Sequence, residues 1–145
     1  MKKLLVVVDY QNDFVDGALG FDKALEIEPY IVKLVKSYQT HNDDIIFTKD
    51  THYENYLETQ EGKTLPVPHC IKGTKGHELH GELEALSKGY KVIEKPAFPS
   101  LELAEILKDK DYKEVKVVGV VTDICVLSNC IMIKSALPEA IITVD

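Results

Sequence analysis

The sequence lacks any apolar run near the roughly 20 residues that a membrane-spanning helix requires, so no membrane partner is expected. It also lacks an excess of positive charge, because 17 Lys and Arg residues stand against 24 Asp and Glu residues, for a formal net charge of −7. This balance, with lysine and glutamate interspersed, disfavours nucleic acid as a partner. Cysteine is scarce, at three residues, and no signal-peptide pattern is present, so we expect a reducing, cytoplasmic location.

Strand and helix patterns alternate along the 145 residues, as they do in proteins built from β-α-β units. Apolar runs predict strands near residues 3–9, 44–49, 90–95, 114–120 and 140–144. Periodic apolar positions predict helices near residues 24–40, 79–87, 101–109 and 123–136, the third with Ser100 as its N-cap. We expect one α/β domain, residues 1–145, with an open, mostly parallel, five-stranded Rossmann-like sheet and helices on both faces.

One segment is too long for a passive connection between elements. Residues 50–76 are rich in Thr, Gly, Pro and His. Loops of this length within a compact domain are usually functional or disordered. Because this one contains histidines and carboxylates, we expect it to carry part of a ligand site.

Cys125 follows the apolar run Val115 to Val121 and opens a predicted helix, so its thiol lies at a strand-to-helix turn. Asp9 and Lys95 also close predicted strands. Because the carboxyl ends of parallel strands share one edge of a sheet, the three side chains can converge there. A cation favours a thiolate, and a carboxylate can accept and return a proton. Each residue also has an ordinary interpretation: a buried cysteine, a helix-capping aspartate and a solvated lysine at a strand end.

Asp50 and His52 end the second predicted strand at a spacing that puts both side chains on one face of an extended segment. His69 follows later in the same loop. One carboxylate with two imidazoles suits Zn, Fe or Mn and leaves positions open for water or substrate. Scattered histidines also occur on surfaces and in ordinary hydrogen bonds. Partners are not evident for the remaining histidines, which we expect to be solvated: His41, His77 and His80.

Five segments carry a resemblance that spans nearly the whole chain. They are residues 8–14 (VDYQNDF), 48–52 (TKDTH), 68–76 (PHCIKGTKG), 94–95 (EK) and 119–125 (GVVTDIC). With these segments in order, the chain resembles the isochorismatase-like cysteine hydrolases, and most closely their nicotinamidase, or pyrazinamidase, branch.

The resemblance implies a catalytic triad of Cys125, Lys95 and Asp9. It also implies a cis peptide between Val120 and Val121, with the N–H groups of Val121 and Cys125 as the oxyanion hole. The implied reaction is hydrolysis of a small carboxamide, with nicotinamide giving nicotinate and ammonia, through a thioester on the cysteine. The sibling reaction on the same fold is hydrolysis of another small amide, a carbamoyl compound or a ureido compound.

The resemblance further implies one divalent metal ion held by Asp50, His52 and His69, with zinc expected and iron or manganese as alternatives. Some relatives add a glutamate before the last histidine, and Glu61 is the matching residue here. The metal would hold the ring nitrogen of the substrate. Phe14 matches an aromatic wall of the substrate pocket. We expect a small-molecule amide as the partner, and a homo-oligomer.

The chain departs from the nicotinamidase pattern in two places. Family members continue with another helix and a sixth strand, whereas this sequence stops at Asp145, so we expect those two elements to be missing. Nicotinamidases often have an aromatic residue three positions before the metal histidine. That position is Pro66 here, preceded by Leu65. We therefore expect a weaker preference for ring amides than in relatives with two aromatic walls.

The position of Cys125 leads to one more expectation and one alternative. Beside Lys95 and a helix N-terminus, the pKa of its thiol should lie below the usual value of about 8.5. The alternative is a non-catalytic binding protein or a thiol redox sensor that uses Cys125 and Cys130. A spacing of five residues on a helix is poor for a local disulfide, which disfavours the sensor.

Overall fold

The computed structural model describes residues 2–145 and contains a five-stranded sheet with the strand order β3-β2-β1-β4-β5. The strands are β1 (Leu4–Val8), β2 (Asp44–Asp50), β3 (Lys91–Lys95), β4 (Glu114–Gly119) and β5 (Ile141–Val144). Every neighbouring pair is parallel. The strands lie where the apolar runs predicted them, so the predicted open parallel α/β sheet is confirmed.

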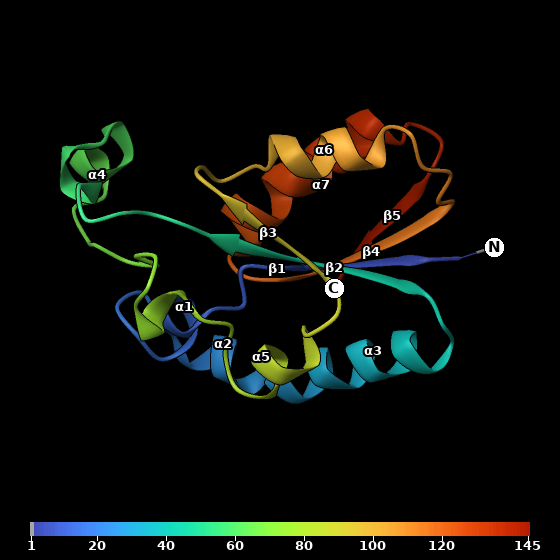
Figure 1. The fold of residues 1–145 in the computed structure, drawn as a ribbon, viewed down its shortest axis with the longest axis horizontal. Helices are drawn as coiled ribbons and strands as arrows, with labels where there is room; N and C mark the ends of the chain where they lie inside the picture. The colour runs from blue at the N-terminus through green and yellow to red at the C-terminus, as the bar shows by residue number, and fades with distance from the viewer. Residues whose placement is uncertain (1) are drawn as a thin grey trace.

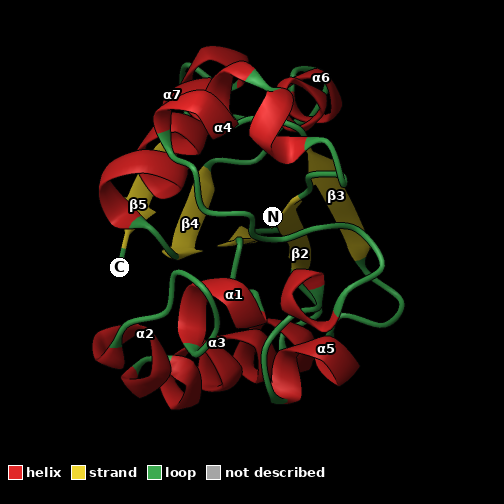
Figure 2. Ribbon diagram, turned by 90° about the vertical axis from the view of Figure 1, so that its left-hand side faces the viewer, coloured by secondary structure: helices red, strands yellow, loops and turns green. Residues whose placement is uncertain are grey.

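Helices cover both faces of the sheet (Figures 1 and 2). They are α1 (Asn12–Val15), α2 (Asp22–Glu26), α3 (Glu28–Thr40), α4 (Gln60–Thr64), α5 (Glu82–Leu86), α6 (Leu101–Leu107) and α7 (Leu127–Ala136). In Figure 1, α1, α2, α3 and α5 lie below the sheet, and α6 and α7 lie above it. Within residues 2–145, no helix has the length and apolar character needed to cross a membrane.

Side-chain alternation along the central strand β1 supplies both hydrophobic layers. Leu5 and Val7 belong to the buried cluster on one face, and Leu4 and Val6 belong to the cluster on the other. Because all the residues of β1 are buried, the strand has a continuous apolar sequence, as expected for a parallel strand covered on both sides. The carboxyl end of β1, at Asp9, is therefore held inside the protein.

Two predicted helices are divided in the structure. The pattern at residues 24–40 breaks at Ile27, because Pro29 has no N–H to continue the helix and instead occupies the first turn of α3. The helix predicted at residues 123–136 begins as a π-helical turn, Thr122–Val126, which continues into α7. Such turns are rare and frequently occur at functional sites.

Ser100 caps α6 as predicted, since its hydroxyl accepts a hydrogen bond from the N–H of Leu103 at 3.0 Å. The helices predicted at residues 79–87 and 101–109 are present but shorter, as α5 and α6. Neither α1 nor α4 was predicted, because helices of four or five residues are too short to show helical periodicity.

The strand order places the site. β1 lies between β2 and β4. The strands β2 and β3 extend the sheet on one side of β1, and β4 and β5 extend it on the other, so the strand order reverses at β1. In open α/β sheets, ligands bind outside the carboxyl ends of the strands at such a switch point. The helix α4 lies beyond the end of the sheet toward which the β2 arrowhead points in Figure 1.

Candidate functional site

Three strand ends supply Asp9, Lys95 and Cys125. Asp9 follows β1, Lys95 is the last residue of β3, and Cys125 lies in the π-helical turn after β4. The three residues are almost inaccessible, with relative exposures of 0%, 1% and 3%. The edge of the sheet that the sequence predicted therefore holds a carboxylate, an ammonium group and a thiol in a buried setting.

Asp9 and Lys95 form a buried ion pair. Nζ of Lys95 lies 2.6 Å from Oδ2 of Asp9 and donates to the Ala97 carbonyl at 3.1 Å. The hydroxyl of Thr48 donates to Oδ1 of Asp9 at 2.7 Å, which orients the carboxylate. Within residues 2–145, Oδ2 of Asp9 has no hydrogen bond of regular geometry besides this ion pair. It therefore keeps a lone pair that can accept a proton.

Gly119 makes the close approach of β4 to β1 at the switch point possible. Its φ is 131°, and a β-carbon there would lie 2.0 Å from the carbonyl oxygen of Val8. Only glycine combines this conformation with this approach. The chain can thus turn directly from β4 toward Cys125 beside the residue that precedes Asp9.

The turn around Cys125 is defined by backbone groups. The peptide between Val120 and Val121 is cis, as the resemblance implied. The N–H groups of Ile124 and Val126 both donate to the Val121 carbonyl, at 3.2 and 3.0 Å. These bonds curl the backbone around Cys125, the fourth residue of the π-helical turn.

The charges of the three groups follow from their burial. Burial raises the pKa of the Asp9 carboxyl above its ordinary 3.8, against the opposing charge of Lys95. Burial alone would lower the pKa of the Lys95 ammonium, but the charges of Asp9, Cys125 and Asp50 together outweigh it and raise that pKa above 10.5. Burial also raises the pKa of the Cys125 thiol above 9.0, and the charge of Asp9 raises it further. The predicted low pKa is therefore wrong: Lys95 is already paired with Asp9, and the sulfur is buried.

The raised pKa of the thiol predicts how the alkylation rate of Cys125 depends on pH. Because the thiolate is the reactive form, the rate with iodoacetamide should still be rising above about pH 8.5, where an ordinary thiol is half ionised. Lys95→Met should move the pH profile of alkylation to more alkaline pH. The variant removes the positive charge that lowers the pKa of the Cys125 thiol. Tandem mass spectrometry that distinguishes label on Cys125 from label on Cys130, with Cys130 as internal reference, gives the profile. A midpoint of the wild-type alkylation profile below about pH 8.5 would contradict a raised pKa for the Cys125 thiol.

A second cluster brings together Asp50, His52, Glu61 and His69, whose ligand atoms all lie within 4.8 Å of one another. Nε2 of His52 lies 3.0 Å from Oδ2 of Asp50 and 3.4 Å from Oε2 of Glu61. Nε2 of His69 lies 3.3 Å from the same oxygen of Asp50. The structure thus gathers the four residues that the resemblance implied as metal ligands, including Glu61 from α4.

The donor set of this cluster fits a divalent metal ion. Nδ1 of His69 lies 2.7 Å from the Val67 carbonyl, which only accepts, so Nδ1 carries the proton. Nε2 then faces Oδ2 of Asp50, and this contact is favourable only with a proton or a metal cation between the two atoms; in the absence of a metal, Asp50 raises the pKa of the imidazole. Two imidazole nitrogens and two carboxylate oxygens match the N/O ligands of zinc and other first-row metals.

Asp50 and Lys95 connect the two clusters. Oδ1 of Asp50 is buried and, within residues 2–145, has no hydrogen-bond partner. It lies 3.9 Å from Nζ of Lys95. The two carboxylates, Asp9 and Asp50, therefore share one buried ammonium, so a ligand held at the second cluster would lie beside the first.

Backbone pairing holds the two histidines of the cluster side by side. The N–H of His52 donates to the Cys70 carbonyl at 3.0 Å, and the N–H of Lys72 donates to the His52 carbonyl at 2.8 Å. Residue 52 therefore pairs with the segment that begins at His69. This contact between distant parts of the 50–76 loop explains why Asp-x-His and a later histidine meet.

Tyr56 supports the cluster from the outside. Its ring packs edge-on against His52 and His69, with centroid distances of 4.8 and 5.1 Å. Its hydroxyl donates to the Leu65 carbonyl at 2.8 Å and lies 3.4 Å from Glu61. The aromatic ring thus fixes the orientation of both imidazoles, and its hydroxyl fixes the two ends of α4.

Gln11 is a supporting residue that the sequence did not reveal. Its fully buried amide donates to the carbonyls of Asp50 and His77, both at 2.9 Å, and accepts from the N–H of Asp50 at 2.8 Å. These bonds hold the backbone of Asp50 in place. The only signal in the sequence was its position, two residues after Asp9 in the VDYQNDF segment.

The prediction that the remaining histidines are solvated is wrong for two of them. His77 is 5% exposed, and its Nε2 lies 2.9 Å from Oγ1 of Thr51. Nδ1 of His80 lies 2.7 Å from Oδ1 of Asn12. Both histidines lie in the segment that folds back along the edge of the sheet. His41 is exposed, as predicted.

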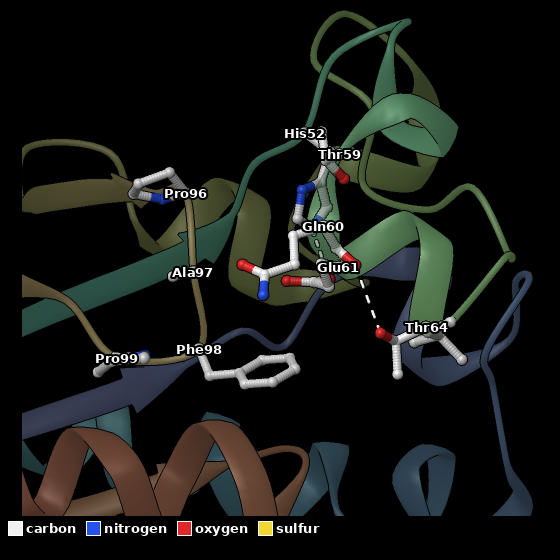
Figure 3. A pocket seen from close by; sticks show the side chains of 10 residues that line it. His52, Thr59, Gln60, Glu61, Thr64, Pro96, Ala97, Phe98 and Pro99 are labelled. Carbon is white, nitrogen blue, oxygen red and sulfur yellow. Dashed lines mark hydrogen bonds and ion pairs between the residues drawn. The ribbon is translucent and has the colours of Figure 1, made fainter.

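A cavity of about 530 Å³ opens beside the second cluster. His52 and residues of the α4 region form one side, and residues 96–99, directly after Lys95, form the other. Figure 3 shows the Phe98 ring pointing between these two sides, toward Glu61 and Thr64. The cavity thus links the cluster to the segment that carries the ion-pair lysine.

The aromatic residue that faces this cavity is Phe98, which the sequence did not single out. Phe98 is 37% exposed, whereas Phe14 is 4% exposed and packs edge-on against His69 at a centroid distance of 5.5 Å. Leu65 lines the cavity beside Pro66. A substrate contact by Phe14 therefore stays a prediction, and Phe98 supplies a ring wall that Pro66 does not.

The comparisons agree with this geometry. A family model described as the isochorismatase domain matches residues 3–134. PncA of Bacillus subtilis, described as an uncharacterized isochorismatase family protein, is 36% identical over 143 residues, covering 90% of this chain and 78% of its own. A solved structure of nicotinamidase PncA from Bacillus subtilis has a TM-score of 0.86 at 31% identity, covering 99% of this chain and 83% of that one.

A third comparison includes a metal. The structure of the Pyrococcus horikoshii pyrazinamidase in complex with zinc has a TM-score of 0.79 at 27% identity, covering 100% of this chain and 88% of that one. The nicotinamidase relatives are amidohydrolases that act on C–N bonds. With a family model that spans most of the chain and a fold shared with these structures, the protein belongs to the isochorismatase family of hydrolases.

Proposed function

We propose that residues 1–145 form one cysteine amidohydrolase domain that cleaves a small carboxamide, with nicotinamide as the leading substrate. The observation that carries the proposal is the 2.6 Å ion pair of Asp9 and Lys95 at the sheet edge that also holds Cys125. A carboxylate, a cation and a thiol are the groups that covalent amide hydrolysis requires. The nicotinamidase relatives support the choice of substrate class.

In the first step, Asp9 accepts the proton of the Cys125 thiol while the sulfur attacks the amide carbonyl. The C–S bond forms, and the C–N bond breaks as Asp9 returns the proton to the departing nitrogen. Ammonia leaves, and the acyl group stays on Cys125 as a thioester. Because the thiol pKa is raised, proton transfer must accompany the attack, which makes Asp9 a base and not only a counter-ion.

In the second step, Asp9 accepts a proton from water, and the oxygen attacks the thioester. A C–O bond forms, the C–S bond breaks, and the free acid leaves as the thiol regains its proton. The N–H groups of Val121 and Cys125 would stabilise the oxyanion of both steps. Lys95 stays charged throughout and keeps the Asp9 carboxylate oriented toward the sulfur.

Asp50, His52, Glu61 and His69 would hold a divalent metal ion, with zinc as the proposed ion. When bound, the metal would supply a Lewis-acidic position for the ring nitrogen of the substrate. The protein's part is to hold this position at a fixed spacing from the reacting carbonyl, which lowers the entropic cost of the reaction. The contact of Asp50 with Lys95 fixes that spacing, because it ties the two clusters together.

Ammonia release from a panel of amides, with metal content measured on the same preparation, tests the proposal. The panel should include nicotinamide, pyrazinamide, acetamide, a carbamoyl compound and a ureido compound. We expect nicotinamide to be hydrolysed in preference to acetamide, because an aromatic contact with Phe98 adds about 0.5–1.5 kcal/mol beyond area burial. Hydrolysis of a carbamoyl or ureido compound alone would reject nicotinamide as substrate. Ammonia from none of them would leave a non-catalytic binding protein as the better account.

A further inference from the structure

Asn129 lies on α7 with 0% exposure. Its amide nitrogen donates to the Cys125 carbonyl at 2.7 Å and to the Phe98 carbonyl at 3.0 Å. Its amide oxygen accepts from the N–H of Ser100 at 2.8 Å. Only this orientation of the amide matches two acceptors and one donor. One buried side chain therefore joins the Cys125 turn to the segment between β3 and α6.

The segment that Asn129 holds, residues 96–99, forms one side of the cavity (Figure 3). Pro96 and Pro99 have no N–H, so the segment has few backbone donors. Within residues 2–145, its backbone carbonyls accept from Lys95, at Ala97, and from Asn129, at Phe98. Asn129 therefore anchors the backbone at Phe98 and Ser100, directly after Ala97, whose carbonyl accepts from the ion-pair lysine.

We propose that Asn129 is a positioning residue that sets the spacing between the Phe98 wall and Cys125, and through it the preference for planar ring amides. The inference rests on the amidohydrolase function proposed above. An apolar residue of the same size would fill the space but would leave the Ser100 N–H and the Phe98 carbonyl without this partner, so the amide is needed to hold the segment. One of its hydrogen bonds holds the backbone of Cys125, and the other two hold the backbone at Phe98 and Ser100. Asn129 thus joins the nucleophile to the segment that carries the ring wall.

The test variant is Asn129→Ser. A serine hydroxyl can donate to the carbonyl four residues earlier in a helix, at Cys125, but is too short to reach Phe98. The variant therefore keeps the bond within the helix and loses the bonds to the segment. We expect kcat/KM for nicotinamide to fall roughly tenfold, mainly through KM, and kcat/KM for acetamide to change by less than about threefold.

Two companion variants separate positioning from stability. Ser100→Ala removes the hydroxyl cap of α6 but keeps the N–H bonded to Asn129, so it should lower the melting temperature and leave the ring preference unchanged. Phe98→Ala should lower the ring preference by itself. Asn129→Ser should add no further loss in the Phe98→Ala background, because both act through the same ring.

If Asn129→Ser lowers the melting temperature as Ser100→Ala does and keeps the wild-type ring preference, the positioning role is overturned. If the wild type releases ammonia from no amide, the proposed function fails instead. The positioning role is then decided by alkylation of Cys125 with iodoacetamide and its N-phenyl analogue. A lower phenyl preference in Asn129→Ser supports the role, and an unchanged preference overturns it.

Discussion

Replacing Cys125 with alanine abolishes amide hydrolysis, with a fall in kcat/KM of at least about 10³-fold, because no other group can form the thioester. The fold survives. Cys125 packs in the apolar cluster beneath α7, and loss of its sulfur should cost only about 1 kcal/mol of unfolding free energy. Ammonia release measured beside a thermal melt by circular dichroism tests both parts of the expectation.

Cys130→Ala is the matched control, because this half-buried cysteine lies on α7, more than one helical turn beyond Cys125. It should keep wild-type turnover. The same pair of variants tests the redox-sensor alternative, since a sensor that uses both thiols would lose its response in either variant. A folded Cys125→Ala protein with near-wild-type turnover would remove Cys125 as the nucleophile.

His52→Ala and His69→Ala are expected to lose the bound metal, with zinc affinity reduced by more than about 100-fold. Changes to residues that only support metal ligands already cost 10–100-fold, and these variants remove a donor atom itself. Amide hydrolysis should fall with the metal, mainly through a higher KM, because the metal's proposed task is to orient the substrate. Metal content by atomic emission and KM on the same samples provide the measurement.

His41→Ala is the control for these two variants, because His41 is exposed and its ring, within residues 2–145, hydrogen-bonds only to the Ser37 carbonyl, so metal content and KM should not change. Circular dichroism must accompany chelation, since metal loss can loosen the 50–76 loop. Wild-type protein that is free of metal in chelator yet fully active would refute the metal assignment. So would His52→Ala and His69→Ala proteins that keep wild-type zinc content.

The strands and most of the site were predictable, because each depends on a short stretch of sequence. Apolar runs mark buried parallel strands, and polar residues directly after them mark the edge where ligands bind. Asp9, Lys95 and Cys125 follow from this rule, the Asp-x-His spacing indicated Asp50, His52 and His69, and the resemblance assigned these three to a metal and added Glu61. The structure then gathered all four within 4.8 Å, including Glu61, which lies on a helix too short to predict.

The features that the sequence did not reveal depend on contacts between three or more distant segments. Gln11 and Asn129 are buried amides whose partners lie on other elements, so no local pattern identifies them. Phe98 becomes a cavity wall only because the 96–99 segment faces α4. The thiol pKa of Cys125 was predicted with the wrong sign, because neither burial nor the pairing of Lys95 with Asp9 is visible in the sequence.

The central claim is that Cys125 carries the acyl group, and trapping that intermediate tests it most directly. Enzyme that is turning over nicotinamide should be quenched in acid, digested and examined by mass spectrometry. The account predicts a nicotinoyl group that fragment ions place on Cys125, absent from Cys70 and Cys130 and absent without substrate. Rapid nicotinate formation with an unmodified Cys125 peptide at every quench time, or with the acyl group on another residue, would contradict it.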